Sequence, residues 1–154
     1  MEVIKTRAAF VIIKRKNPTN GRWQFLVMWS TQLVATKRRP EGHKMLKFPS
    51  GSEKFPGEPP AAIANREVRE ETRLAYLESV EIRKETLDDD HERYGYLLDF
   101  GDCYGEMRTW EERDGNELLG PPHWVDAADL YNKNWICEGH RDFCGAGCRF
   151  LGIL

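Results

Sequence analysis

The stretch Gly57–Leu74, which reads G-E-P-P-A-A-I-A-N-R-E-V-R-E-E-T-R-L, constrains this chain more than any other. Its proline pair, Pro59 and Pro60, suits a helix start, because the N–H that proline lacks has no partner in the first helical turn. The glutamate before the prolines suits the positive end of the helix dipole. Nearly every residue in Ala61–Thr72 is a fair helix former. The sequence therefore predicts a helix over this stretch.

The predicted helix has two unlike faces, because successive residues are rotated by about 100°. One face is small and apolar enough to pack closely on a sheet, and it comprises Ala61, Ala64, Val68, Thr72 and Ala75. Glu67, Glu70 and Glu71 share the neighbouring face within one turn. Carboxylates at this spacing repel one another by about a few tenths of a kcal/mol per pair in water, and by more where water is scarce. Such an edge favours a bound cation, and Mg²⁺ is the hard divalent ion that best suits oxygen ligands here.

Three arginines, Arg66, Arg69 and Arg73, are interspersed with these glutamates, so a solvated helix with salt bridges is the alternative interpretation. The spacing favours the cation site, because it resembles the box of the Nudix hydrolases, written G-x5-E-x7-R-E-U-x-E-E-x-G-U with U aliphatic. The chain matches this box in register at Glu58, Arg66, Glu67, Val68, Glu70, Glu71 and Leu74. On these residues the chain is identified as a member of the Nudix hydrolase family.

Two positions depart from the box. Ser52 stands where the box begins with glycine, and the nearest glycine, Gly51, comes one residue early. The loop before the helix, F-P-S-G-S-E-K-F-P-G-E, is one residue longer than the family's usual F-P-G-G-x-x-E-x-G-E. Arg73 stands where the box has its second glycine, which normally ends the helix in the left-handed conformation. Because arginine adopts that conformation only at a cost, we expect the helix to continue or to end differently.

The resemblance implies a metal-binding and catalytic role for the box glutamates. Mg²⁺ is the expected ion, with Mn²⁺ as an alternative, and Glu70 and Glu71 are expected to be catalytic as well as metal-binding. The full set of expected metal ligands is Glu67, Glu70, Glu71 and a backbone carbonyl of Gly51. The resemblance also implies that Arg66 and Glu58 form the ion pairs that orient these carboxylates.

A further carboxylate is expected in the acidic segment Glu111–Pro122. In several members of the family, a loop glutamate six or seven residues before a Trp-aliphatic strand binds metal or acts as general base. Glu117 stands seven residues before Trp124 and is the catalytic candidate on this resemblance. Glu111 and Glu112 compete for the role, and a merely solvated Glu117 is the alternative.

The segment Gln32–Lys47 is predicted to be a loop rich in basic residues. Its position before the F-P-S-G segment would let Arg38, Arg39 and Lys44 bind the phosphates of a polyanionic substrate. A solvated loop without this role is the alternative.

The remaining sequence alternates between apolar segments and turn residues, which predicts an α/β fold. The predicted strands are Val3–Lys16, Trp23–Trp29, Met45–Pro49, Tyr76–Leu87, Tyr94–Phe100, Cys103–Trp110 and His123–Asp126, the sixth of which is expected to pair with the fifth. Asp88–Arg93 is predicted to be an acidic turn and Glu111–Pro122 a flexible loop. A helix N-capped by Asp126 follows the last strand, and a closing helix is expected within His140–Leu154, with Phe143, Phe150 and Leu151 facing inward. This order predicts an α/β/α sandwich with a mixed β-sheet, as the Nudix resemblance also implies.

The length and charge of the chain indicate one domain over residues 1–154, large enough for a core of its own. A net charge of −2 gives no electrostatic reason to expect binding to nucleic acid or to a membrane. No apolar run reaches the length of a membrane span, and the N-terminus lacks the features of a signal peptide. We therefore expect a cytoplasmic monomer or homodimer with a small-molecule substrate.

The cysteines offer ligands for one other candidate metal site. Cys137, His140, Cys144 and Cys148 form a C-x2-H-x3-C-x3-C run, which has ligands that zinc accepts. The favoured interpretation is that Cys144 and Cys148 pack as small apolar residues one helical turn apart. Reduced thiols are expected because no secretory signal is present.

The resemblance implies hydrolysis of a diphosphate linkage in a nucleoside diphosphate joined to another group. Dense negative charge on the phosphoryl groups repels water, and divalent ions counter this repulsion. A nucleoside or pterin triphosphate is the substrate we expect first, and dinucleoside polyphosphates, nucleotide sugars and capped RNA are alternatives. Two other classes remain open: a module that binds a nucleotide without turnover, and a structural domain whose glutamates form only surface salt bridges.

Overall fold

The structure is a computed structural model that describes residues 6–88 and 90–154, except for the side chain of residue 88. Residues 3–5 of the first predicted strand and Asp89 of the predicted acidic turn lie outside the described residues. The strands are β1 (Thr6–Lys16), β2 (Trp23–Gln32), β3 (Lys44–Lys47), β4 (Ser50–Ser52), β5 (Ala75–Tyr76), β6 (Val80–Asp88), β7 (His91–Asp99), β8 (Cys103–Tyr104), β9 (Glu112–Asp114), β10 (Glu117–Leu119) and β11 (His123–Asp126). The helices are α1 (Pro60–Thr72), α2 (Ala127–Asn132) and α3 (Glu138–Phe150), with a short 3-10 turn at Phe100–Asp102.

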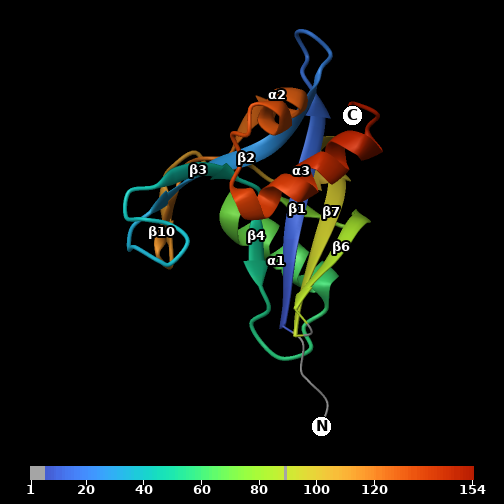
Figure 1. The fold of residues 1–154 in the computed structure, drawn as a ribbon. Coiled ribbons are helices and arrows are strands. Elements are labelled where there is room, and N and C mark those ends of the chain that lie inside the picture. The colour runs from blue at the N-terminus through green and yellow to red at the C-terminus, as the bar shows by residue number, and fades with distance from the viewer. Residues whose placement is uncertain (1–5, 89) are drawn as a thin grey trace.

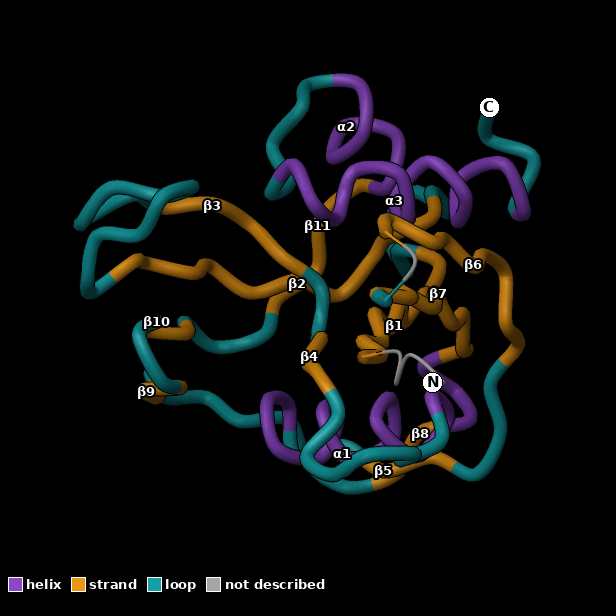
Figure 2. Tube along the Cα trace, turned by 60° about the horizontal axis from the view of Figure 1, so that its bottom comes forward, coloured by secondary structure: helices purple, strands orange, loops and turns teal. Residues whose placement is uncertain are grey.

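These elements form three layers. The sheet lies between α1 on one face and α2 and α3 on the other, as Figure 1 and Figure 2 show from two sides. The strand order is β6-β7-β1-β2-β10-β9, and β1 runs parallel to β7 but antiparallel to β2. The predicted α/β/α sandwich with a mixed sheet is therefore confirmed. In residues 6–88 and 90–154, no helix is both long enough and apolar enough to cross a membrane.

The central strand β1 has a hydrophobic core on each side, because alternate side chains of a strand point to opposite faces. Phe10 and Ile12 pack toward α2 and α3 with Phe143, while Val11 and Ile13 pack toward α1. The continuous apolar run in the sequence thus marks a strand that is buried on both faces. On the α3 side a glycine permits close approach: a Cβ on the helix residue Gly147 would lie 3.0 Å from Ile12 Cδ1.

The sheet splits where β1 and β2 diverge, and this split positions the site. The two strands pair only where Lys14–Lys16 meets Trp23–Phe25. Beyond that point β2 pairs with β3 and β10, while β4 takes the place beside β1. The chain passes from β3 to β4 across this split, and Figure 1 shows β3 and β10 extending away from β1 with β2. Lys47, Ser50 and Gly51 therefore face the helix α1, while Phe48 packs in the core on the other side of the sheet.

Helix α1 begins and ends largely as its sequence predicts. Ala64, Val68 and Thr72 are buried as expected, but Ala61 is exposed and Ile63, which the predicted face omitted, is buried in its place. The expectation that Arg73 would alter the helix end is wrong. The helix stops at Thr72, and Arg73 itself adopts the left-handed conformation, with φ 71°, that a glycine would have supplied.

The segment Glu111–Pro122 was predicted to be a flexible loop, and this is wrong. It contains the hairpin β9–β10, in which Asp114 pairs with Glu117 across the turn residues Gly115 and Asn116. Gly115 has φ 58°, which glycine adopts without strain. A two-residue Gly-Asn turn is a hairpin signal that the acidic character of the segment obscured.

Three other local predictions need correction. The strand β8 pairs with β5 rather than with β7, because the 3-10 turn capped by Asp99 redirects the chain beneath α1. Most of the predicted turn Asp88–Arg93 belongs to strands, and Arg93 forms an ion pair with Glu85 of the neighbouring strand β6. In α3 Phe143 is buried as predicted, whereas Phe150 lies in the last turn and is exposed.

Candidate active site

Three carboxylates converge beside the split in the sheet. Glu67 and Glu71 from α1 and Asp114 from β9 each offer an oxygen, and these oxygens lie within 4.8 Å of one another. We call this set the three-carboxylate cluster. Within residues 6–88 and 90–154, it is the only group of three or more histidine, cysteine, aspartate or glutamate side chains close enough to hold one ion. Asp114 was not among the predicted site residues.

Glu71 is the most deeply buried member of the cluster, with a side chain only 3% exposed. Its Oε1 accepts a hydrogen bond of 2.8 Å from the backbone N–H of Ser50. Its Oε2 is buried and has no hydrogen-bond partner, and the nearest cation, Lys47 Nζ, is 3.9 Å away. Burial raises the pKa of Glu71 to about 8, although the charge of Lys47 and the bond from Ser50 act in the opposite direction. An unpartnered buried carboxylate oxygen is costly, and a cation held there would remove that cost.

Glu67 is held in place by its neighbour Arg66. One guanidinium nitrogen of Arg66 donates to Glu67 Oε1 at 2.5 Å, and another donates to Glu58 Oε1 at 2.9 Å. The hydrogen bond from Arg66 lowers the pKa of Glu58, while burial raises the pKa of Glu67 despite the charge of Arg66. The arrangement agrees with the orienting role expected for Arg66 and Glu58, which stays a prediction.

Gly51 lies directly against the carboxylate of Glu67. A Cβ at Gly51 would be 2.2 Å from both Cδ and Oε1 of Glu67, which no real contact permits. The shifted glycine of the loop therefore leaves the space that the Glu67 side chain fills. A backbone carbonyl of Gly51 as metal ligand stays a prediction.

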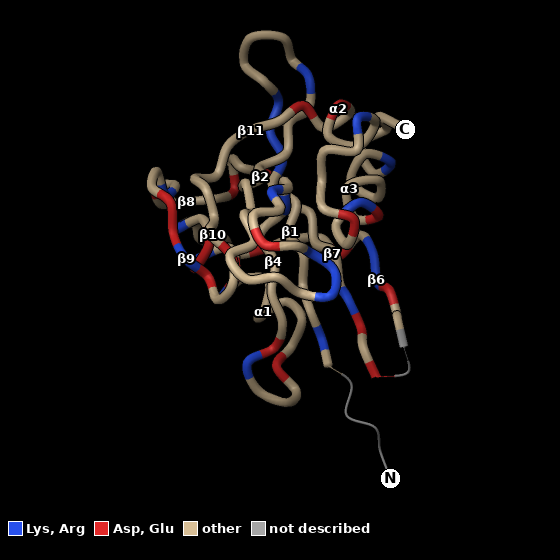
Figure 3. Tube along the Cα trace, turned by 60° about the vertical axis from the view of Figure 1, so that its left-hand side comes forward, with Lys and Arg blue, Asp and Glu red and all other residues tan. Residues whose placement is uncertain are grey.

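Glu70 differs from the two other box glutamates because its side chain is 43% exposed. It forms an ion pair of 3.0 Å with Lys54. It also borders a cavity of about 180 Å³, lined by Glu70, Glu71, Glu112, Arg113, Asp114 and Leu119. Figure 3 shows acidic and basic positions mixed along the β9–β10 hairpin, which supplies much of this lining. Glu70 thus faces the same open cavity as Glu71 and Asp114 of the three-carboxylate cluster.

Glu117 belongs to a second group of charges, on the sheet side of the cluster. Its Oε1 accepts from Ser30 Oγ at 2.8 Å and from Arg39 at 3.1 Å, and its Oε2 accepts from Lys47 Nζ at 3.1 Å. The neighbouring cations, together with the hydrogen bonds from Ser30 and Lys47, lower its pKa although burial alone would raise it. Both oxygens of Glu117 are therefore engaged by donors of the protein itself.

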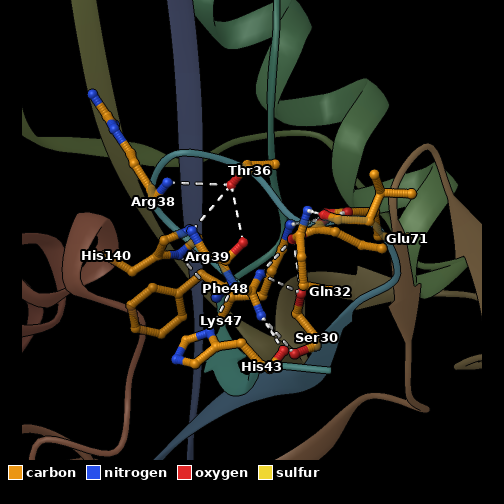
Figure 4. A network of polar contacts seen from close by, with 12 residues as sticks. Ser30, Gln32, Thr36, Arg38, Arg39, His43, Lys47, Phe48, Glu71 and His140 are labelled. Carbon is orange, nitrogen blue, oxygen red and sulfur yellow. Dashed lines mark hydrogen bonds and ion pairs between the residues drawn. The ribbon is translucent and has the colours of Figure 1, made fainter. Parts of the chain in front are cut away.

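The predicted phosphate-binding residues separate in the structure. Arg39 folds inward and donates to the carbonyls of Ser30 and His43 at 2.9 and 2.8 Å, in the network that Figure 4 shows. Arg38 is exposed, and Lys44 places its Nζ 5.0 Å from the centre of the Trp29 ring. Contact of these three residues with phosphate stays a prediction.

Two arginines join the hairpin to the end of α1. Arg108 is fully buried and donates from Nε to the carbonyl of Glu71 at 2.9 Å and from Nη2 to the carbonyl of Gly120 at 3.0 Å. Arg73 forms an ion pair with Glu112 of β9. Because Asp114 is two residues from Glu112, these contacts hold the third carboxylate beside the helix. The sequence did not predict either contact, since neither is local in the chain.

The run of Cys137, His140, Cys144 and Cys148 does not form a metal-binding group among the described residues. His140 is buried, and its Nδ1 accepts from the backbone N–H of Phe48 at 3.1 Å. Cys144 and Cys148 are buried in the core beneath α3, as the favoured interpretation predicted.

The three-carboxylate cluster fits a hard divalent ion. Its donors are all carboxylate oxygens, which Mg²⁺ and Mn²⁺ accept and which soft ions disfavour. The buried Oε2 of Glu71, which accepts no hydrogen bond, is an oxygen that a bound ion would satisfy.

Comparison with solved structures identifies the fold. An ADP compounds hydrolase superposes with a TM-score of 0.68 at 16% identity, over 97% of this chain and 76% of that one. The NUDIX domain of Shewanella oneidensis NrtR, complexed with ADP ribose, gives a TM-score of 0.65 at 10% identity, over 96% of this chain and 88% of that one. This chain has the Nudix fold. A MutT NUDIX hydrolase from Burkholderia pseudomallei shares it, with a TM-score of 0.63 at 18% identity, over 92% of this chain and 97% of that one. No protein-family model and no curated protein sequence matches the chain. The Nudix fold is thus established by structure, and the box in α1 is the sequence feature that agrees with it.

Proposed function

We propose that this protein is a Mg²⁺-dependent pyrophosphohydrolase that cleaves a diphosphate linkage in a nucleotide-type substrate. The observation that supports the proposal most is the buried, unpartnered Oε2 of Glu71 within the three-carboxylate cluster. Within the Nudix fold this cluster lies between the box helix and the β9–β10 hairpin, and its members Glu71 and Asp114 line a cavity. A divalent ion bound there would neutralise phosphate charge and lower the pKa of a bound water.

The protein's own residues have distinct roles in this proposal. Glu67, Glu71 and Asp114 hold the ion, and Arg66 keeps Glu67 oriented toward it. Glu70 is proposed as the general base, because it borders the same cavity and its side chain is open to water. Glu117 contributes as the partner of Lys47 and Arg39 rather than as a base, since both its oxygens accept hydrogen bonds.

The residues that line the cavity do not identify the organic part of the substrate. A nucleoside or pterin triphosphate remains our first choice, with phosphates contacted by the exposed Arg38 and Lys44 of the basic loop. ADP-ribose and related compounds are the second choice, because one structural neighbour was solved with ADP ribose and another is named an ADP compounds hydrolase. Dinucleoside polyphosphates are the third. We place the protein in the cytoplasm, as a monomer or homodimer.

A release assay tests the proposal. The protein is incubated with millimolar Mg²⁺ and a panel of triphosphates, ADP-ribose, dinucleoside polyphosphates and a pterin triphosphate, and phosphate and pyrophosphate are measured. Glu71→Gln and Asp114→Asn should each lower turnover at least about tenfold, because each removes a charged ligand. Glu138→Gln, an exposed change at the start of α3, serves as control. Turnover without divalent ions, or unchanged turnover in Glu71→Gln, would contradict the assignment.

A nucleotide-binding module without turnover is the competing function. It predicts that a panel member binds in the presence of Mg²⁺ while no product appears over hours. A structural domain predicts neither binding nor product. The exposed Glu70 at the cavity edge favours the enzyme, because a module that only binds has no use for a base at that place.

A further inference from the structure

A lysine lies where the sheet approaches the three-carboxylate cluster. Lys47 belongs to β3, and its side chain is only 10% exposed. Its Nζ is 3.1 Å from Glu117 Oε2 and 3.9 Å from Glu71 Oε2. The ammonium group therefore stands between a carboxylate of the cluster and a carboxylate of the sheet. Figure 4 shows Lys47 together with Arg39 and Ser30 in this network.

The surroundings of Lys47 are built to keep it there. Glu117 is held from its other oxygen by Ser30 and Arg39, so it cannot turn away from the lysine without breaking both contacts. The N–H of Ser50 holds the other oxygen of Glu71. Each carboxylate thus points one oxygen at the ammonium group and has its second oxygen anchored.

The charges around the cluster come close to what one divalent ion balances. With the carboxylates ionised, Glu71 and Glu117 are matched by Lys47 and Arg39 through their ion pairs. Arg66 is shared by Glu58 and Glu67, which leaves one negative charge, and Asp114 adds a second. Glu70 and Glu112 have cationic partners in Lys54 and Arg73, and Arg108 lies 3.6 Å from Glu112 as a further cation. One negative charge remains uncompensated, so a single divalent ion suffices to balance the cluster.

This inference rests on the proposed metal site. We propose that Lys47 is a built-in cation: its ammonium group takes the place of a second divalent ion between Glu71 and Glu117. The free protein then binds one divalent ion, at the three-carboxylate cluster. A second ion beside Glu117 would have to approach the ammonium group, and like charges in a buried site repel strongly. Removing the charge of Lys47 leaves the facing oxygens of Glu71 and Glu117 free to hold a second ion in its place.

The stoichiometry of Mn²⁺ binding to the free protein tests this inference. Free Mn²⁺ is measured by its electron paramagnetic resonance signal, and calorimetry gives the heat of each site. The wild type should bind one ion and Lys47→Gln should bind two. Lys47→Arg, which keeps the charge, should bind one. Lys133→Gln is the control, because it removes an exposed lysine at the end of α2, away from the site, and it should also bind one.

The outcomes separate this inference from the proposed function. One ion in the wild type and two in Lys47→Gln supports the built-in cation. Two ions in the wild type, or one in Lys47→Gln, overturns it and leaves the metal site standing. No ion in the wild type overturns the metal site and the inference with it. If Lys47→Gln does not fold, Lys47→Met keeps the packing of the side-chain stem and must show the second ion for the inference to stand.

Discussion

Gly51 and Glu67 occupy one space: the carboxylate of Glu67 fills the position that a Cβ on Gly51 would need. The contact joins β4 to α1 across the loop that precedes the helix. It explains why the loop keeps a glycine at this place although its sequence has shifted by one residue from the box. The side chain of Glu67 can reach Asp114 and Glu71 only while residue 51 has no side chain in this space.

Gly51→Ala is therefore expected to displace Glu67 from the three-carboxylate cluster. A Cβ only 2.2 Å from Cδ cannot be accommodated without moving the carboxylate or the strand. We expect Mn²⁺ affinity and Mg²⁺-dependent turnover to fall at least about tenfold, because Glu67 would no longer be oriented toward the ion. Calorimetry and the release assay measure these effects. Gly139→Ala is the control, because the nearest atom there is the flexible end of Arg93 at 3.4 Å. Equal metal affinity in Gly51→Ala and wild type would show that Glu67 does not need this space.

Arg73 provides a second prediction, because it adopts a left-handed conformation with φ 71°. Arg73→Ala and Arg73→Gly both remove the ion pair with Glu112, and only the glycine relieves the backbone strain. The glycine variant should be more stable than the alanine variant by about 1 kcal/mol. Urea unfolding of the two variants measures the difference. Equal stabilities would mean that residue 73 relaxes to another conformation once its side chain is removed.

How much of this structure follows from the sequence depends on how local each signal is. Helix α1 could be predicted because its prolines, its helix formers and its charge spacing all lie within one short stretch. Which glutamate is buried could not, because the helical period alone places Glu70 and Glu71 on one edge. The N–H of Ser50 and the ammonium of Lys47, which reach Glu71 from the sheet, make the difference.

Asp114 is a site residue that the sequence does not predict. Its place in the site depends on the register of the β9–β10 hairpin and on the two arginines that hold that hairpin to α1. The Gly-Asn turn would have predicted the hairpin, but nothing in the sequence predicts which side of the molecule it contacts. The position of Glu117 also depends on strand register. Its pairing with Gln32 of β2 brings its side chain to Lys47.

His140 should make the stability of the protein depend on pH. Burial, with the nearby charges of Lys47 and Arg93, lowers the pKa of His140 well below its ordinary value. Above about pH 6.5 both folded and unfolded states carry a neutral imidazole, so this residue contributes no pH dependence there. As the pH falls below that value the unfolded state binds the proton first, and stability is lost by up to about 1.4 kcal/mol per pH unit.

His140→Asn should therefore reduce the loss of stability between about pH 7 and about pH 5. The side-chain carbonyl of asparagine can still accept from the N–H of Phe48, and no proton is gained. Urea unfolding at several pH values measures the slope. Phe143→Leu is the control, since it weakens the same core without removing a titrating group. A slope in His140→Asn equal to that of the wild type would show that other groups cause the acid sensitivity.

Arg108 is the residue whose loss should harm both stability and metal binding, because it connects the two parts of the site. Its guanidinium is buried among the carbonyls of Glu71, Leu119 and Gly120, and its Nε is 3.6 Å from Glu112. In Arg108→Met the stem is kept, but these carbonyls lose their donor and the hairpin loses its anchor. We expect a loss of about 3 kcal/mol in the free energy of unfolding, as for other broken buried charge networks. Mn²⁺ affinity should fall as well, because Asp114 is no longer held beside Glu67. Arg149→Gln, which alters an exposed arginine at the end of α3, should change neither. If Arg108→Met lost stability yet bound Mn²⁺ as the wild type does, Asp114 would not be a ligand, since its position is the one part of the cluster that depends on this arginine.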